Sequence, residues 1–147
     1  MRIEVRGTVG GHASRTWDMF GAFGNIADWH PLIADSVLES APGPGGGPVR
    51  AMVTGDRGRI REELLVSDSV GRRLGYEILE SPFSVRSYRA EVLVLESGTP
   101  GSCEVLGATE FEPVDLAKEA ALGSLFEENV FKAGIEALNQ VMGARRG

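Results

Sequence analysis

The segment RIREELLVSDSVGRRLGYEILE, residues 59–80, carries the clearest structural signal in this 147-residue chain. Apolar and polar residues alternate along 59–67 and again along 73–80, which is typical of half-buried β-strands. The residues between them, DSVG at 68–71, are typical of a short turn. Because strands joined by so short a connection pair antiparallel, this segment predicts part of an antiparallel sheet.

The alternating pattern continues on both sides of this segment. We expect further strands at residues 3–9, 36–39, 49–54, 85–96 and 103–112. The segment APGPGGGP at 41–48 is so rich in glycine and proline that it predicts a loop. Consecutive strands with short connections predict an antiparallel meander, with about seven strands in the whole chain.

Helices are expected at two places. Ser14 is a candidate N-cap for a first short helix, and residues 26–29 predict a second short helical turn after it. Apolar residues recur at helical spacing from 116 to 142, which predicts one long helix with Asp115 as its N-cap and Gly143 as its stop. The order of elements predicts an α+β fold, a curved antiparallel sheet around a helix, in a single domain over residues 1–147.

Composition narrows the functional classes. Hydrophobic residues make up 42% and charged residues 24% of the chain, values typical of a globular domain. The net charge of −6 and the absence of a basic stripe argue against nucleic-acid binding. No segment approaches the roughly 20 apolar residues of a membrane span. The N-terminal pattern is not that of a signal peptide, and the single Cys103 cannot form an internal disulfide, so we expect a cytoplasmic monomer or homodimer.

The sequence contains no recognisable cofactor motif. Two histidines and one cysteine, far apart in the chain, do not make a zinc site. Neither a phosphate-binding glycine loop nor a nucleophile elbow is present. We therefore expect no metal and no cofactor.

Several short motifs, together with the order of elements, resemble a known superfamily. They are Trp17, FGNIADWHP at 23–31, REELL at 61–65, Asp68, RRL at 72–74, YEI at 76–78 and FEP at 111–113. Over nearly its whole length the chain is similar to the START/Bet v 1-like (SRPBCC) superfamily, and within it to the polyketide cyclase/dehydratase-like branch. The resemblance implies a helix-grip fold with an internal cavity for a hydrophobic small molecule. Relatives often carry tryptophan where this chain has Leu106-Gly107-Ala108, so the cavity is wider here unless a larger neighbour fills the space.

Strand alternation indicates which side chains face such a cavity. The more apolar face carries Glu62 in one strand, Tyr76 in the next and Tyr88 in the one after. The same alternation brings Arg86 inward. The turn at 55–58 would set Arg50 opposite Glu62.

The inner face of the last strand is ambiguous from the sequence. Either Leu106, Ala108 and Glu110 or Gly107, Thr109 and Phe111 face the helix. We favour the first set because it would place Glu110 opposite Tyr88. The expected apolar lining is then Met52, Leu64, Ile78, Val92, Leu106, Phe126 and Val130.

Glu62 is the leading catalytic candidate. A carboxyl group buried in apolar surroundings has a raised pKa and can act as a general base or acid. The alternative is a structural ion pair with Arg50, which would lower the pKa instead. The resemblance favours ligand contact, because relatives often place an acid at the position of Glu62.

The other polar candidates also have two interpretations each. His30 could exchange protons near neutral pH or close the short helix with a hydrogen bond. Tyr88 and Tyr76 could donate to a ligand carbonyl or be core residues with satisfied hydroxyls. Arg50 and Arg86 could clamp an anionic ligand group or form ion pairs within the protein. Further substrate contacts are expected from Met52, Leu106, Glu110, Phe126, Val130 and Trp29.

These features predict two possible functions that share one pocket. The first is a cofactor-free cyclase/dehydratase of the lyase type, in which Glu62 moves a proton and His30, Arg50 and Tyr88 position or polarise an apolar substrate. The second is a non-catalytic carrier or sensor of a hydrophobic ligand, with residues 55–58 and 81–83 as gate loops.

Overall fold

The hairpin at residues 59–80 is confirmed as two paired strands inside the sheet. In the structure, a computed structural model that describes residues 1–146 and side chains as far as Gly143, it forms β4 (Arg59–Asp68) and β5 (Arg73–Glu80). The described residues form a seven-stranded antiparallel sheet with the order β1-β7-β6-β5-β4-β3-β2. The other strands are β1 (Arg2–Val9), β2 (Ile33–Leu38), β3 (Val49–Thr54), β6 (Val85–Glu96) and β7 (Cys103–Pro113).

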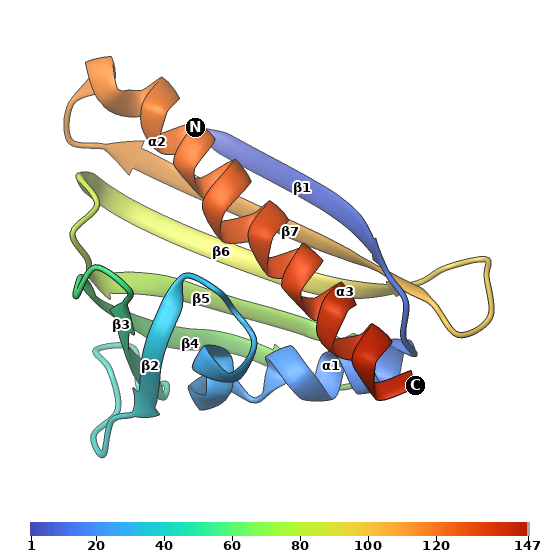
Figure 1. Cartoon of the computed structure of the whole chain (residues 1–147). Coiled ribbons are helices and arrows are strands. Elements are labelled where there is room, and N and C mark those ends of the chain that lie inside the picture. Colours follow the sequence, from blue (N-terminus) through green and yellow to red (C-terminus); the bar gives the residue numbers. More distant parts are fainter. Residues whose placement is uncertain (147) are drawn as a thin grey trace.

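A long C-terminal helical run crosses one face of this sheet (Figure 1). It comprises η2 (Leu116–Lys118), α2 (Glu119–Leu125), the π-helical stretch η3 (Phe126–Lys132) and α3 (Ala133–Arg146). Two short helices, α1 (Ala13–Gly21) and η1 (Phe23–Asp28), follow β1, and α1 packs against α3. The α+β helix-grip architecture expected from the sequence is therefore confirmed. Among residues 1–146, no helix is both long and apolar enough to cross a membrane.

The ends of the helices differ in part from the sequence prediction. Asp115 is confirmed as a cap, because its carboxylate accepts a hydrogen bond from the backbone N–H of Ala117 at 3.0 Å. The prediction of Ser14 as an N-cap is wrong. The helix α1 begins at Ala13, so that Ser14 lies inside it and the N-cap is His12. Gly143 is not the stop of the last helix, since α3 continues to Arg146.

Phe126 fixes the helical run to the sheet. Its side chain is fully buried, and its ring makes edge-on contacts with Phe83, Tyr88 and Phe111 at centroid distances of 5.3, 4.9 and 5.0 Å. Edge-to-face pairs of this kind add to the free energy gained by burying the rings. This aromatic cluster therefore sets the height of the helix above the strands.

The inner face of β7 is the opposite of the one that we favoured. Tyr88 pairs with Phe111, and Arg89 pairs with Glu110, so the register differs by one residue from our expectation. Side chains on a strand alternate between faces, and a shift of one residue exchanges the two sets. Gly107 and Phe111 consequently lie on the inner side, whereas Glu110 is exposed.

The prediction that Arg86 points inward is also wrong. The pairing of β6 with β7 shifts between Val85 and Ser87, which is a local irregularity of the bulge type. An extra residue at such a point breaks the strict alternation of faces. The Arg86 side chain is exposed, outside the space between the sheet and the helix.

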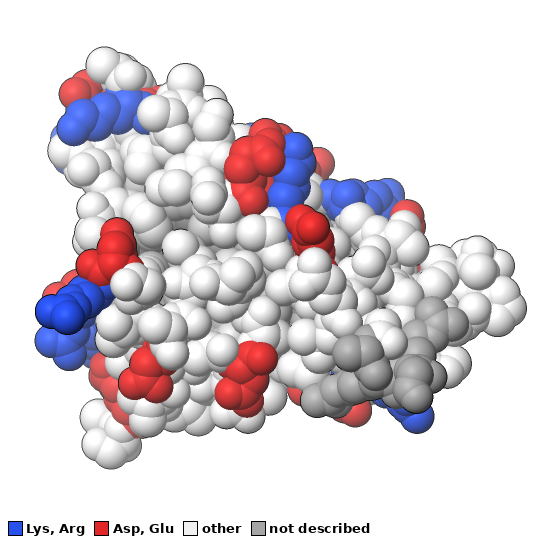
Figure 2. All heavy atoms as spheres, viewed as in Figure 1, with Lys and Arg blue, Asp and Glu red and all other residues white. Residues whose placement is uncertain are grey.

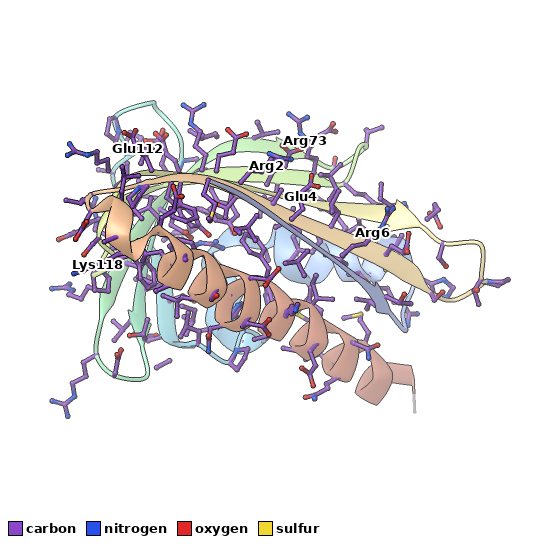
Figure 3. All side chains as sticks on the ribbon, turned by 90° about the horizontal axis from the view of Figure 1, so that it is seen from above. Arg2, Glu4, Arg6, Arg73, Glu112 and Lys118 are labelled. Atoms are coloured by element: carbon purple, nitrogen blue, oxygen red, sulfur yellow. The ribbon has the colours of Figure 1, made fainter. Side chains whose placement is uncertain are left out.

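The face of the sheet away from the helix is covered by charged side chains of both signs. Figure 3 shows Arg2, Glu4 and Arg73 on this side. Cross-strand ion pairs join Arg2 to Glu110 at 3.3 Å and Arg89 to Glu77 at 3.3 Å. Exposed pairs contribute little to stability, but they keep the face polar. The helix-bearing face likewise carries acidic and basic residues side by side, with uncharged surface between them (Figure 2).

Glu63 behaves differently from its outward-facing neighbours. The alternation places it on the face opposite Glu62, yet the side chain is fully buried. The glycine-rich loop at 41–48 folds over it, and the backbone N–H groups of Gly45 and Gly47 each donate to its carboxylate at 3.1 Å. An added Cβ at Gly47 would lie 2.1 Å from the carbonyl oxygen of Leu64, so only glycine permits this close approach.

Gly107 generates a stability prediction. An added Cβ there would lie 2.4 Å from Cδ1 of Phe131, so Gly107→Ala should lower the free energy of unfolding by about 1–3 kcal/mol. The measurement is urea unfolding of both proteins. Gly98→Ala is the matched control, because no atom lies within 4 Å of its added Cβ. Equal unfolding midpoints for the two variants would contradict the expected clash.

Candidate functional site

An internal cavity lies between the sheet and the helical run. The space that the centre of a water molecule can occupy in it is about 80 Å³. Its walls come from α1, η1, β2 to β7 and the last two helical segments, and most of its lining side chains are apolar. Its titratable lining residues are His30, Arg50, Glu62, Tyr76 and Tyr88. An apolar pocket with a few directed polar groups is the usual form of a small-molecule site.

The structure brings most of the predicted site residues to this cavity. The lining includes His30, Glu62, Tyr88, Arg50, Met52, Tyr76, Val130 and Trp29. Ile78 and Val92, expected from strand alternation, line it as well.

Four predicted contacts lie elsewhere. Arg86 and Glu110 are exposed, and Leu106 is half-buried on the outer side of β7. Phe126 is buried between helix and sheet, but in the aromatic cluster rather than in the cavity wall. Leu64, expected among the lining residues, packs in the core beside the cavity.

Several lining residues were not singled out from the sequence. Leu74 shares its face of β5 with Tyr76, so the same alternation would have identified it. Gly134 and Leu138 lie four and eight positions after Val130, and helical spacing would have found them. Phe131 lies in the π-helical stretch and contributes to the cavity lining from there. The sequence does not reveal the helical register of this stretch.

Arg50 and Glu62 form a buried ion pair at the centre of the site. Nε and Nη2 of Arg50 lie 2.9 and 2.7 Å from the same oxygen, Oε1 of Glu62. Nη1 donates to the carbonyl oxygen of Phe23 at 3.2 Å. The guanidinium also lies 4.1 Å from the ring centroid of Phe23 and 4.7 Å from that of Tyr76. The two charged groups therefore pair with each other, across the β3–β4 register that the sequence predicted.

The second oxygen of Glu62 is left open. Both Arg50 contacts fall on Oε1, and no hydrogen-bond donor among the described residues reaches Oε2. Burial raises the pKa of Glu62 above its usual value of 4.5, and the opposing effect of Arg50 does not cancel it. Glu62 is thus a carboxyl group with raised proton affinity in the wall of an apolar cavity.

His30 is held by both of its ring nitrogens. Nε2 lies 2.8 Å from the carbonyl oxygen of Val130, and Nδ1 accepts a hydrogen bond from the backbone N–H of Leu32 at 3.1 Å. This pair of contacts fits a neutral ring with its proton on Nε2. Burial lowers the pKa of His30, the charge of Arg50 lowers it further, and the Val130 carbonyl opposes both effects. The ring has room because Gly134, with no side chain, lies against it.

Tyr76 and Tyr88 are neutral phenols in this site. Burial raises the pKa of both, and the nearby charge of Glu62 adds to the effect. Their hydroxyl groups therefore keep their protons at neutral pH. They can donate hydrogen bonds but do not act as bases.

Trp29 lines the cavity, but its indole nitrogen is not open to it. Nε1 is buried and has no hydrogen-bond acceptor among the described residues. A buried donor without a partner is costly.

No metal centre is apparent in the described part of the chain. Within residues 1–146, no three His, Cys, Asp or Glu side chains gather in a way that could hold an ion. The single cysteine, Cys103, is buried and hydrogen-bonds to Thr16 at 3.4 Å, away from the cavity lining.

Comparison with known proteins identifies the family. A family model described as polyketide cyclase/dehydrase and lipid transport matches residues 1–143. The chain belongs to this family. No curated protein sequence matches it.

Solved structures agree with this family membership. XoxI from Bacillus cereus is 25% identical, with a TM-score of 0.84, and the match covers 99% of this chain and 98% of that one. The Zhui aromatase/cyclase from Streptomyces sp. R1128 is 18% identical, with a TM-score of 0.81 over 100% and 96% of the two chains. Norcoclaurine synthase from Thalictrum flavum, in complex with dopamine and hydroxybenzaldehyde, is 18% identical, with a TM-score of 0.75 over 100% and 88%. The last two share the fold, which does not by itself carry an activity.

The ion pair generates a pH-dependent stability prediction. Arg50→Met leaves Glu62 buried without its partner, which should cost about 3–5 kcal/mol of unfolding free energy. Because an unpaired buried carboxyl group becomes neutral by binding a proton, the loss should be larger at pH 8 than at pH 5. Urea unfolding at both pH values measures it. The double variant Arg50→Met/Glu62→Leu should recover much of the loss, and a double variant as unstable as the single one would contradict the pairing.

His30 generates a second pH prediction. Its pKa is lowered from 6.5 in the folded protein, so the unfolded chain binds the proton more readily. The stability that neutral His30 contributes is therefore present above pH 6.5 and is lost as the pH falls toward the folded pKa. The stability difference between the wild type and His30→Gln should narrow as the pH falls below that value, in urea unfolding. A difference that widens instead would contradict the neutral, doubly bonded ring.

Proposed function

We propose that the chain binds a small hydrophobic molecule in this cavity and catalyses a cofactor-free proton-transfer reaction on it, of the cyclisation or dehydration type. The observation that supports it most directly is the open Oε2 of Glu62, with raised proton affinity, in an apolar wall. A carboxyl group in that setting is suited to move protons near neutral pH. The similarity in fold to the Zhui aromatase/cyclase adds support by analogy only.

The proposed chemistry needs a base that becomes an acid. Ionised Glu62 would take a proton through Oε2 from a carbon next to a substrate carbonyl. The resulting carboxylic acid would return that proton to the departing hydroxyl group, so that water leaves and a carbon–carbon double bond forms. In cyclisation, the same carbanion would close onto a second carbonyl, and the proton would go to the new alkoxide.

Other groups in the cavity would assist without exchanging protons. Tyr88 keeps its hydroxyl proton and would donate a hydrogen bond to the substrate carbonyl, where negative charge develops. Arg50 holds Oε1 of Glu62 and so would orient Oε2 toward the substrate. His30 has both ring nitrogens engaged and would position the cavity wall rather than act as a base.

A second candidate function is a carrier that binds the same ligand unchanged. The structure offers one observation in its favour. The only charged groups in the described lining, Arg50 and Glu62, already pair with each other, as a purely structural pair would. Binding without turnover is then the simpler role for an otherwise apolar cavity.

Glu62→Gln separates the two candidates. The substitution keeps the shape of the side chain and removes its ability to exchange a proton. Mass spectrometry of copurified molecules supplies the starting compound, and polyketide-like polycarbonyl compounds form the test panel. If the protein is an enzyme, Glu62→Gln should lower kcat by about 100- to 10,000-fold while ligand affinity changes little.

The matched control for this experiment is Glu110→Gln. It makes the same chemical change on the exposed outer side of β7, outside the cavity. This control should retain full turnover. If Glu62→Gln turned over substrate as fast as the control did, the catalytic role of Glu62 would be refuted. If the wild type bound these compounds and turned none of them over, the carrier would remain.

A further inference from the structure

The charges in the cavity wall constrain the charge of its ligand. Among the described residues that line the cavity, the charged side chains are Arg50 and Glu62, which lie 2.7 Å apart and cancel each other. His30 makes the hydrogen bonds of a neutral ring. A charged ligand would therefore bring an unbalanced charge into an apolar space, at a cost of several kcal/mol. A neutral ligand avoids that cost.

One polar atom of the wall lacks a partner. Oε2 of Glu62 is a carboxylate oxygen that accepts hydrogen bonds, and no described donor reaches it. A ligand that satisfies this oxygen must offer a hydrogen-bond donor, and a hydroxyl group is an uncharged one.

The cavity volume constrains the size of the ligand. About 80 Å³ is open to water centres. An apolar cavity of about 150 Å³ binds benzene, so a space of this size admits a molecule of no more than about one ring. A molecule built around a single ring is of that scale. The aromatic and aliphatic side chains of Phe20, Ile78, Val92 and Phe131 supply an apolar surface for it.

We propose that the ligand class of this cavity is a neutral, single-ring hydroxylated molecule whose hydroxyl group donates to Oε2 of Glu62. This inference rests on the proposed binding function. It does not depend on whether the protein is also an enzyme. The hydroxyl bond to a charged acceptor gives the ligand its orientation, and the ring fills the apolar space.

The experiment titrates the chain with four single-ring probes: phenol, toluene, benzoate and benzylammonium. Binding is followed by two-dimensional NMR, in which the indole N–H signal of Trp29, assigned with Trp29→Phe, reports on the cavity wall. Phenol should bind at least about tenfold more tightly than toluene, because only phenol donates to Glu62. Both charged probes should bind more weakly than phenol.

One variant and a control isolate the polar contact. Glu62→Gln replaces the charged acceptor by a neutral one and should reduce the preference for phenol over toluene several-fold. Glu110→Gln should behave as the wild type.

The possible failures are distinguishable. If toluene or a charged probe bound as tightly as phenol, the ligand class would be wrong, while the cavity would remain a binding site. If none of the four probes moved the signals of cavity residues, both this inference and the proposed binding function would be overturned.

Discussion

The buried pair of Arg50 and Glu62 is the interaction on which the site depends. Removing two charges from water is costly, and their attraction offsets that cost only when the remaining hydrogen-bonding groups also find partners. Arg50 meets this condition through the Phe23 carbonyl and the faces of Phe23 and Tyr76. Glu62 meets it through one oxygen only. The contacts of Arg50 tie η1, β3, β4 and β5 together, and they leave Oε2 of Glu62 without a partner in the cavity wall.

Strand alternation predicted the inner residues well where the apolar side of a strand is clear. Glu62, Tyr76 and Tyr88 face the cavity because each lies in a strand whose apolar residues fall clearly on one side. At β7 the pattern could not choose a face, because Ala108, on the outer side, is buried as well. The orientation of Arg86 was predicted wrongly for another reason. An irregularity in the β6–β7 pairing turns its side chain to the outer face, and no residue type in the sequence marks that irregularity.

The glycines show how sequence and cavity are connected. The resemblance implied a bulky side chain where this chain has Leu106-Gly107-Ala108, so that either a wider cavity or a larger neighbour was expected. The structure shows a larger neighbour, because the ring of Phe131 lies where a side chain at 107 would stand. Gly134 likewise has no side chain and leaves room for the ring of His30. Phe131 belongs to the π-helical stretch and Gly134 follows it. The periodicity of the sequence does not reveal the change of helical register in this stretch.

The fold and the family point to the hydrophobic cavity as the functional site. Which ligand it takes and which chemistry it supports depend on the polar atoms of its wall. Proteins that share this fold at 18% identity include an aromatase/cyclase and a norcoclaurine synthase, so the fold alone does not select one chemistry. In this chain the wall is charge-balanced and its histidine is fully engaged. One carboxylate oxygen remains for a ligand. We therefore expect any proton transfer here to pass through Glu62, because Oε2 has no partner among the described residues and burial raises the pKa of this carboxyl group.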